Sequence, residues 1–132
     1  MVNILVIAHS EIANSFAYCV EHILNKRVDN LHILAVKKAE DTDSILARAR
    51  ELIDKIKHDY NDEVLILSDL FGATPCNIAQ RLVEKDKIEL ISGLNLPMLI
   101  RAISYAKNKL SDVVKKSLEG AVSGIVHFTG DE

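Results

Sequence analysis

The stretch LVIAHSEIANSF (residues 5–16) sets the expected fold of this chain. An almost unbroken aliphatic run ends at His9, and apolar residues then recur at helical spacing. Such aliphatic runs are typical of strands that are buried on both faces of a parallel sheet. We therefore expect a strand over residues 2–8, with His9 at its carboxyl end and a helix that begins near Ser10.

Strands and helices alternate along the remaining chain. The further strands that we predict lie at residues 31–36, 63–68 and 88–91. The alternation indicates an α/β fold with an open, mostly parallel four-stranded sheet and helices on both faces. Apolar residues at helical spacing between positions 45 and 56 predict a second helix. Thr74 and Pro75 suit the N-cap and first position of a third helix, which is expected to reach about Val83. Two helices are expected near residues 97–109 and 111–119.

The end of the chain is expected to add one short strand. Residues 120–128 (GAVSGIVHF) are β-rich but interrupted by glycine. No linker, internal repeat or low-complexity segment divides the sequence, so we expect a single domain over residues 1–132.

The composition excludes several classes of protein. Of 132 residues, 48% are hydrophobic, and the net charge of −3 comes from interspersed signs, which predicts a buried core and no nucleic-acid surface. Cys19 and Cys76 lie far apart, which disfavours a disulfide framework or a structural zinc site. No apolar stretch approaches the roughly 18 residues that span a bilayer, and the first residues lack the features of a signal peptide. A cytoplasmic protein is expected.

The candidate site combines His9 with Asp69. In open α/β sheets, ligands bind beyond the carboxyl ends of the strands, where the strand order reverses. In a flavodoxin-like order the strands that end before His9 and Asp69 are neighbours, so the two side chains should face each other. A carboxylate that accepts a hydrogen bond from one imidazole nitrogen fixes the tautomer and leaves the other nitrogen free to attack.

Anion-binding groups are expected beside this pair. Two helices are predicted to begin near Ser10 and at Thr74, and their free N–H groups favour an anion. The turn before Thr74 adds the amides of Gly72 and Ala73, and Gly72 lets the backbone come close to a ligand. Imidazole, carboxylate and amides together indicate phosphoryl transfer to His9. Each residue also has a purely structural interpretation. His9 could be an ordinary hydrogen-bonded histidine, Asp69 a turn or cap residue, and Gly72 an ordinary turn glycine.

The other polar groups are interpreted as structural. The remaining histidines (His22, His32, His58 and His127) show no metal-ligand spacing, and neither a metal nor a cofactor is expected. The charged stretch KKAED (residues 37–41) is interpreted as a solvated loop. Cys76, near a helix N-terminus, is interpreted as a small packed residue.

Three segments resemble a known family. SDLFGATPCN (residues 68–77) and ISGLNLPML (residues 91–99) are similar to the DLFGGTP-x-N and G-x-N-x-P-M-L segments of the IIA proteins of the mannose/fructose/sorbose family of the bacterial sugar phosphotransferase system. VIAHS (residues 6–10) is the third match. The resemblance covers essentially the whole length.

The resemblance implies a phosphocarrier. His9 would accept a phosphoryl group from the phosphohistidine of HPr and pass it to a IIB component, with the membrane components IIC and IID involved only indirectly. Asp69 would orient the ring, the phosphate would sit on the nitrogen remote from Asp69, and Thr74 would lie near it. Family members form homodimers that exchange a C-terminal strand, for which residues 120–128 are the candidate, antiparallel to the sheet.

A docking surface for both protein partners is expected around His9. The residues assigned to it are Leu70, Phe71, Leu94, Asn95, Leu96 and Met98, for which loop packing is the alternative interpretation. Ala8, Ser10 and Ala73 depart from common residues of the family, which affects the expected phosphate contacts; Ser10 could itself donate to a phosphate oxygen.

Other functions remain open from the sequence. The protein could be a regulatory phosphoprotein of an incomplete phosphotransferase system. A histidine followed by serine also fits the phosphocarrier subunit of dihydroxyacetone kinases, although that relative lacks segments like those at residues 68–77 and 91–99. A flavodoxin-like nucleotide or flavin binder is disfavoured, because no glycine-rich loop follows the first strand.

Overall fold

A computed structural model describes residues 1–60 and 63–131 of the chain. Its sheet has four strands, all parallel, in the order β2-β1-β3-β4. The strands are β1 (Asn3–His9), β2 (Leu31–Val36), β3 (Val64–Ser68) and β4 (Ile88–Ser92). The expected α/β class is thereby confirmed, and β1 and β3, which precede the two candidate site residues, are neighbours.

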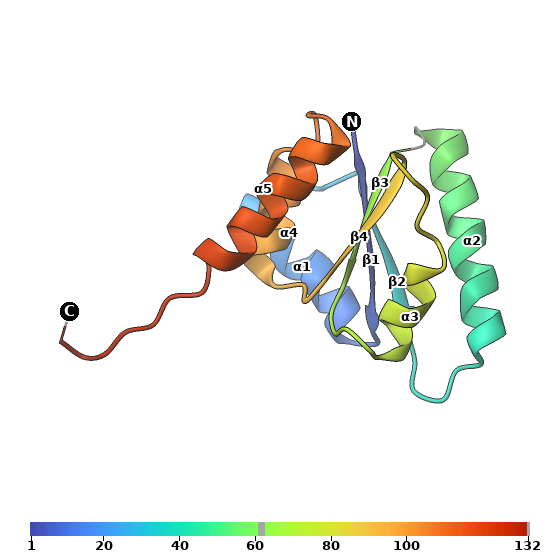
Figure 1. Cartoon of the computed structure of the whole chain (residues 1–132), viewed down its shortest axis with the longest axis horizontal. Helices are drawn as coiled ribbons and strands as arrows, with labels where there is room; N and C mark the ends of the chain where they lie inside the picture. The colour runs from blue at the N-terminus through green and yellow to red at the C-terminus, as the bar shows by residue number, and fades with distance from the viewer. Residues whose placement is uncertain (61–62, 132) are drawn as a thin grey trace.

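Helices cover both faces of the sheet (Figure 1). The helices are α1 (Ile12–Leu24), α2 (Thr42–Asp59), α3 (Thr74–Gln80), α4 (Leu96–Ser104) and α5 (Leu110–Ser123). One face carries α2 and α3, and the other carries α1, α4 and α5. None of the helices in the described ranges combines the length and the apolar character that crossing a bilayer requires.

The pleat of β1 divides its side chains between two cores. Ile4, Val6 and Ala8 are fully buried against α1, α4 and α5. Leu5 and Ile7 are fully buried against α2 and α3. Because side chains alternate along a strand, His9 continues the second series and lies at the edge of the α2/α3 face.

The predicted last strand is absent from the described chain. Instead, α5 continues to Ser123, and residues 124–131 have no regular secondary structure. The physical reason lies in two glycines that face α4. A Cβ at Gly120 would collide with Arg101, and one at Gly124 would collide with Pro97. These glycines therefore allow close approach of α4 and α5 rather than interrupting a strand.

Several helix boundaries also differ from those predicted, including the end of α4, which lies at Ser104 and not near residue 109. Helix α1 begins at Ile12 rather than near Ser10, and its N-cap, Glu11, has a φ of 72°. In α3 the N-cap is Ala73, one residue before the predicted one, and the helix ends at Gln80 instead of near Val83.

His32 of β2 makes stability depend on pH. Its Nε2 lies 3.2 Å from Oδ1 of Asn3, and its ring packs edge-on against Tyr60 at a centroid distance of 5.3 Å. Burial, reinforced by the positive charge of Lys55, lowers the pKa of His32 from its ordinary value of 6.5. The unfolded chain therefore binds a proton at His32 more readily than the folded chain does.

We predict that His32→Asn weakens the acid dependence of stability. The contribution of His32 is fully present above about pH 6.5 and is lost as the pH falls from there toward the lowered pKa of the folded state. Urea unfolding at pH 7 and pH 5 measures this, and the loss between the two should be smaller in the variant. An equal or larger loss in His32→Asn would contradict it.

Candidate functional site

His9 and Asp69 meet at the carboxyl edge of the sheet. Nδ1 of His9 lies 2.6 Å from Oδ2 of Asp69, and the backbone N–H of His9 donates to the same oxygen at 3.1 Å. The parallel pairing of β1 with β3 joins these residues, which are sixty positions apart in sequence. The structure thus brings together the two side chains that the sequence placed at neighbouring strand ends.

The pair leaves one imidazole nitrogen available. A carboxylate can only accept, so Nδ1 of His9 carries the proton and Nε2 keeps its lone pair. The His9 side chain is 49% exposed, whereas that of Asp69 is 12% exposed. The other carboxylate oxygen, Oδ1, is buried and has no hydrogen-bond partner in the described chain. His9 therefore supplies both of the hydrogen bonds described for Asp69.

The turn after β3 presents Thr74 to the same edge. Gly72 has a φ of 88°, in the region that favours glycine, and it reverses the chain after Asp69. Ala73 has extended backbone geometry and caps α3, so Thr74 becomes the first helical residue. Pro75 follows in the first turn, where its missing N–H costs no helical hydrogen bond. Thr74 is exposed, as expected for a residue that could contact a ligand.

A hollow of about 500 Å³ joins these groups to the loop after β2. It is lined by His9, Ser10, Glu11, Val36, Lys37, Lys38, Ala39, Glu40, Thr42, Thr74 and Pro75. Its lining residues come from the end of β1, the start of α2 and the start of α3. Figure 1 shows these three element ends at the bottom of the sheet.

The contribution of residues 37–40 to this hollow was missed in the sequence, where they were interpreted as solvated loop. The signal that could have found them is strand register. Val36 is the partner of His9 in the β1–β2 ladder, so the residues after Val36 lie beside the residues after His9.

Ser10 contributes to the hollow differently from what was predicted. Its backbone N–H donates to the carbonyl of Val36 at 2.8 Å, which joins the β1–α1 turn to the end of β2. That amide is therefore already engaged, and it does not belong to the first turn of α1. The Ser10 side chain remains as the possible donor to a bound anion.

Two of the predicted docking residues belong to the core. Leu94 is 7% exposed and Met98 is 2% exposed, and both pack in the cluster beneath α1, α4 and α5. Asn95 is structural in the described chain: its Oδ1 caps α4 by accepting from the N–H of Met98 at 2.9 Å, and its Nδ2 donates to the carbonyl of Ala121 at 3.1 Å. Leu96 is partly buried against the same cluster.

Exposed apolar surface lies instead on the turn after β3. Leu70 and Phe71 are 60% and 73% exposed, directly after Asp69. Of the residues predicted to form the docking surface, Leu70 and Phe71 are thus the ones that are plainly accessible.

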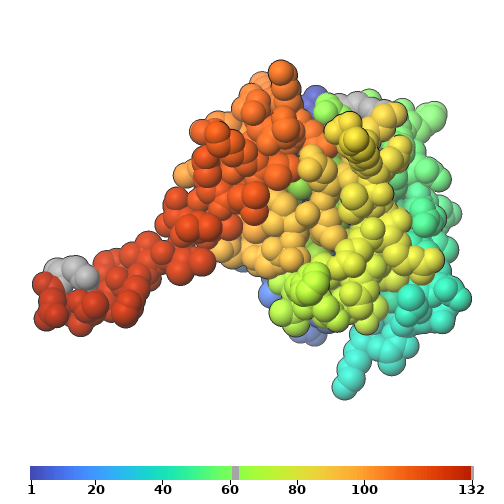
Figure 2. Space-filling model, viewed as in Figure 1, coloured from blue at the N-terminus to red at the C-terminus, as the bar shows by residue number. Residues whose placement is uncertain are grey.

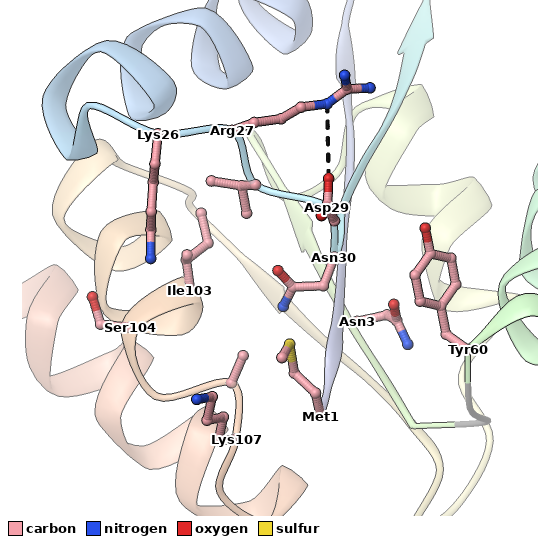
Figure 3. A pocket seen from close by; sticks show the side chains of 12 residues that line it. Met1, Asn3, Lys26, Arg27, Asp29, Asn30, Tyr60, Ile103, Ser104 and Lys107 are labelled. Atoms are coloured by element: carbon pink, nitrogen blue, oxygen red, sulfur yellow. Dashed lines mark ion pairs between the residues drawn. The ribbon is translucent and has the colours of Figure 1, made fainter.

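A second hollow, of about 640 Å³, lies at the opposite end of the strands, near the amino-terminal ends of β1 and β2 (Figure 3). Lys26 and Lys107 contribute to its wall, and Arg27 pairs with Asp29 at 3.7 Å. None of its lining residues forms a pair of histidine and carboxylate. Within residues 1–60 and 63–131, no group of three or more His, Cys, Asp or Glu side chains could hold a metal ion.

Comparison with known protein sequences points to the same family as the three sequence segments did. Residues 3–118 match the family described as "PTS system fructose IIA component". The chain is 30% identical over 106 residues to the PTS system sorbose-specific EIIA component of Lacticaseibacillus casei, covering 80% of this chain and 74% of that protein. It is 28% identical over 81 residues to the PTS system fructose-specific EIIA component of Bacillus subtilis, covering 61% of this chain but only 54% of that relative.

Solved structures show the same fold. The phosphotransferase system component EIIA of Streptococcus agalactiae superposes with a TM-score of 0.85 at 25% identity, covering 98% of both chains. The mannose/sorbose specific IIA subunit of Enterococcus faecalis superposes with a TM-score of 0.86 at 19% identity, covering 99% of this chain and 97% of that one. The second likeness concerns the fold alone.

Proposed function

This chain belongs to the mannose/fructose/sorbose family of phosphotransferase-system IIA components, and we propose that it carries a phosphoryl group on His9. Membership of the family supports a phosphocarrier role in sugar uptake. We propose more specifically that His9 accepts the group from phospho-HPr and passes it to a IIB component. The observation that carries this proposal is the hydrogen bond between His9 and Asp69 at an open edge of the sheet.

The proposed step exchanges one nitrogen–phosphorus bond for another. The lone pair on Nε2 of His9 attacks the phosphorus of the donor phosphohistidine. The bond from phosphorus to the donor nitrogen breaks, and its electron pair stays on the donor ring. The His9 ring keeps its Nδ1 proton and gains positive character, which the Asp69 carboxylate stabilises at 2.6 Å. Transfer to the acceptor repeats these steps with His9 as the donor.

Groups around the hollow suit the transferred phosphoryl group. We propose that the Thr74 hydroxyl and the amide of Gly72 lie near its oxygens, with the Ser10 hydroxyl on the other side. The Ala73 amide, which the sequence also suggested, donates instead to the carbonyl of Leu70 at 3.3 Å. The exposed Phe71, together with Leu70, would contact each protein partner in turn. Partners that alternate at one histidine require an accessible ring, and the 49% exposure of His9 meets that requirement.

We predict that phospho-HPr labels the native chain and not His9→Ala. Asp69→Ala should still be labelled, but about 10- to 100-fold more slowly, the loss that follows removal of a carboxylate that orients a metal-bound histidine, because here too the ring would lose its fixed orientation. Rapid-quench transfer of labelled phosphate measures both rates. The label on the native chain should be acid-labile and base-stable.

The surface pair of His58 and Asp59 provides the matched control. Its Nδ1–Oδ1 distance is 2.9 Å, but it lies at the end of α2, where the His58 side chain is 88% exposed. His58→Ala and Asp59→Ala should transfer at the native rate. Normal labelling of His9→Ala would overturn the proposed function, and a native rate in Asp69→Ala would remove Asp69 from the mechanism.

We also propose that the chain forms a homodimer through its C-terminal segment. Residues 124–131 project from the rest of the molecule (Figures 1 and 2). Ile125, Val126 and Phe128 are all more than 60% exposed there, as is Val122 at the end of α5. Apolar side chains on an extended segment support docking onto a second copy, since burying them would remove this surface from water.

Removal of residues 124–132 should convert the dimer into a monomer. Sedimentation equilibrium of the native and shortened chains measures this, and circular dichroism checks that α5 is retained. A native chain that is monomeric at high concentration, or a shortened chain that remains dimeric, would contradict the proposed assembly.

A further inference from the structure

Hydrogen bonds position the loop between β2 and α2 beside His9. The backbone N–H of Lys37 donates to Oε1 of Glu40 at 3.0 Å, and the N–H of Glu40 donates to the carbonyl of Lys37 at 3.3 Å. Asp41 caps α2 by accepting from the N–H and the hydroxyl of Ser44, each at 3.1 Å. The loop therefore has a defined place at the rim of the hollow.

The carboxylate of this loop is already paired, whereas its lysines are not. Glu40 accepts from the backbone of Lys37 and forms an ion pair with Arg48. These contacts, together with the positive charge of Lys37, lower the pKa of Glu40 even though desolvation opposes them. Neither Lys37 nor Lys38 has an ion-pair partner in the described parts of the chain. Two exposed ammonium groups without a salt bridge thus stand at the hollow that His9 lines, although Lys37 also acts on Glu40 at longer range.

We propose that Lys37 and Lys38 stabilise the phosphoryl group on His9 electrostatically. This inference rests on the proposed function. Lys37 directly follows Val36, the ladder partner of His9, and neighbouring strands lie only about 4.8 Å apart. Each lysine carries its ammonium group on a flexible four-carbon stem, which lets it follow the phosphate oxygens without a fixed contact.

The charges around the site explain why such cations are needed. The phosphoryl group adds negative charge next to Asp69, and the carboxylates of Glu11 and Glu40 line the adjoining hollow. The chain as a whole has a net charge of −3. Without Lys37 and Lys38, the group would be held among like charges, because Glu40 and Arg48 neutralise each other.

The hollow at the opposite edge offers a matched pair of lysines. Lys26 and Lys107 line it and also lack an ion-pair partner among the described residues (Figure 3). The seven residues of β1 separate the two edges by about 20 Å, more than the Debye length of about 8 Å at physiological ionic strength. Lys26→Ala/Lys107→Ala therefore removes the same charge without touching the site.

The experiment needs no protein partner. Phosphoramidate phosphorylates imidazole directly: its P–N bond breaks, ammonia leaves and the Nε2–P bond forms. The ³¹P resonance that is absent from treated His9→Ala belongs to His9, and its shift is followed against pH. Nearby cations weaken proton binding by the phosphorylated ring and by its oxygens alike.

We expect Lys37→Ala/Lys38→Ala to raise the midpoint of this titration by about half a pH unit, the size that fits two exposed cations a few ångströms away. Lys37→Arg/Lys38→Arg should restore the native midpoint, Lys26→Ala/Lys107→Ala should leave it unchanged, and 1 M salt should shrink the difference.

The outcomes separate this inference from the proposed function. If neither phosphoramidate nor phospho-HPr labels His9 in the native chain, the proposed function fails. If His9 is labelled and the midpoint is the same in the native chain and Lys37→Ala/Lys38→Ala, only the role of the lysines is overturned. An equal shift in Lys26→Ala/Lys107→Ala would also overturn it, because the effect would then reflect net charge alone.

Discussion

The site depends on one hydrogen bond that the sheet itself creates. Strands β1 and β3 are separated by a strand and two helices in sequence, yet they pair in parallel and end at the same edge. That pairing sets Nδ1 of His9 2.6 Å from Asp69. The bond fixes which nitrogen carries the proton, and about half of the His9 side chain remains exposed. The orientation and the exposure of the His9 ring thus follow from the positions at which β1 and β3 end.

The pleat of β1 decides what surrounds the histidine. Odd-numbered positions of β1 face α2 and α3, so His9 opens toward the beginnings of those helices. Thr74 at the start of α3 and the loop that leads into α2 are therefore the neighbours of His9. The other face is filled by α1, α4 and α5, where Leu94 and Met98 are packed. A shift of one residue in the register of β1 would point the His9 ring at the face covered by α1, α4 and α5 instead.

Much of this could be predicted from sequence, because the decisive signals are local. Aliphatic runs located the strands, and the carboxyl-edge rule paired His9 with Asp69 before any contact was known. Tertiary packing determined the rest. Glycine interrupts a strand and also permits two helices to touch, and only the approach of α4 to Gly120 and Gly124 distinguishes these roles. The burial of Leu94 depends on how α1, α4 and α5 pack together, which residue spacing does not predict. The position of Lys37 beside His9 depends on the register between β1 and β2, which the spacing does not predict either.

The ring nitrogen that carries the phosphoryl group tests the central claim most directly. Long-range ¹H–¹⁵N and ³¹P–¹⁵N couplings in the phosphorylated, ¹⁵N-histidine-labelled protein identify that nitrogen. If the bond to Asp69 fixes the tautomer, the phosphorus is bonded to Nε2 of His9 while Nδ1 keeps its proton. Phosphorus on Nδ1 would show that Asp69 does not hold this nitrogen in solution, and the account of the site would be wrong.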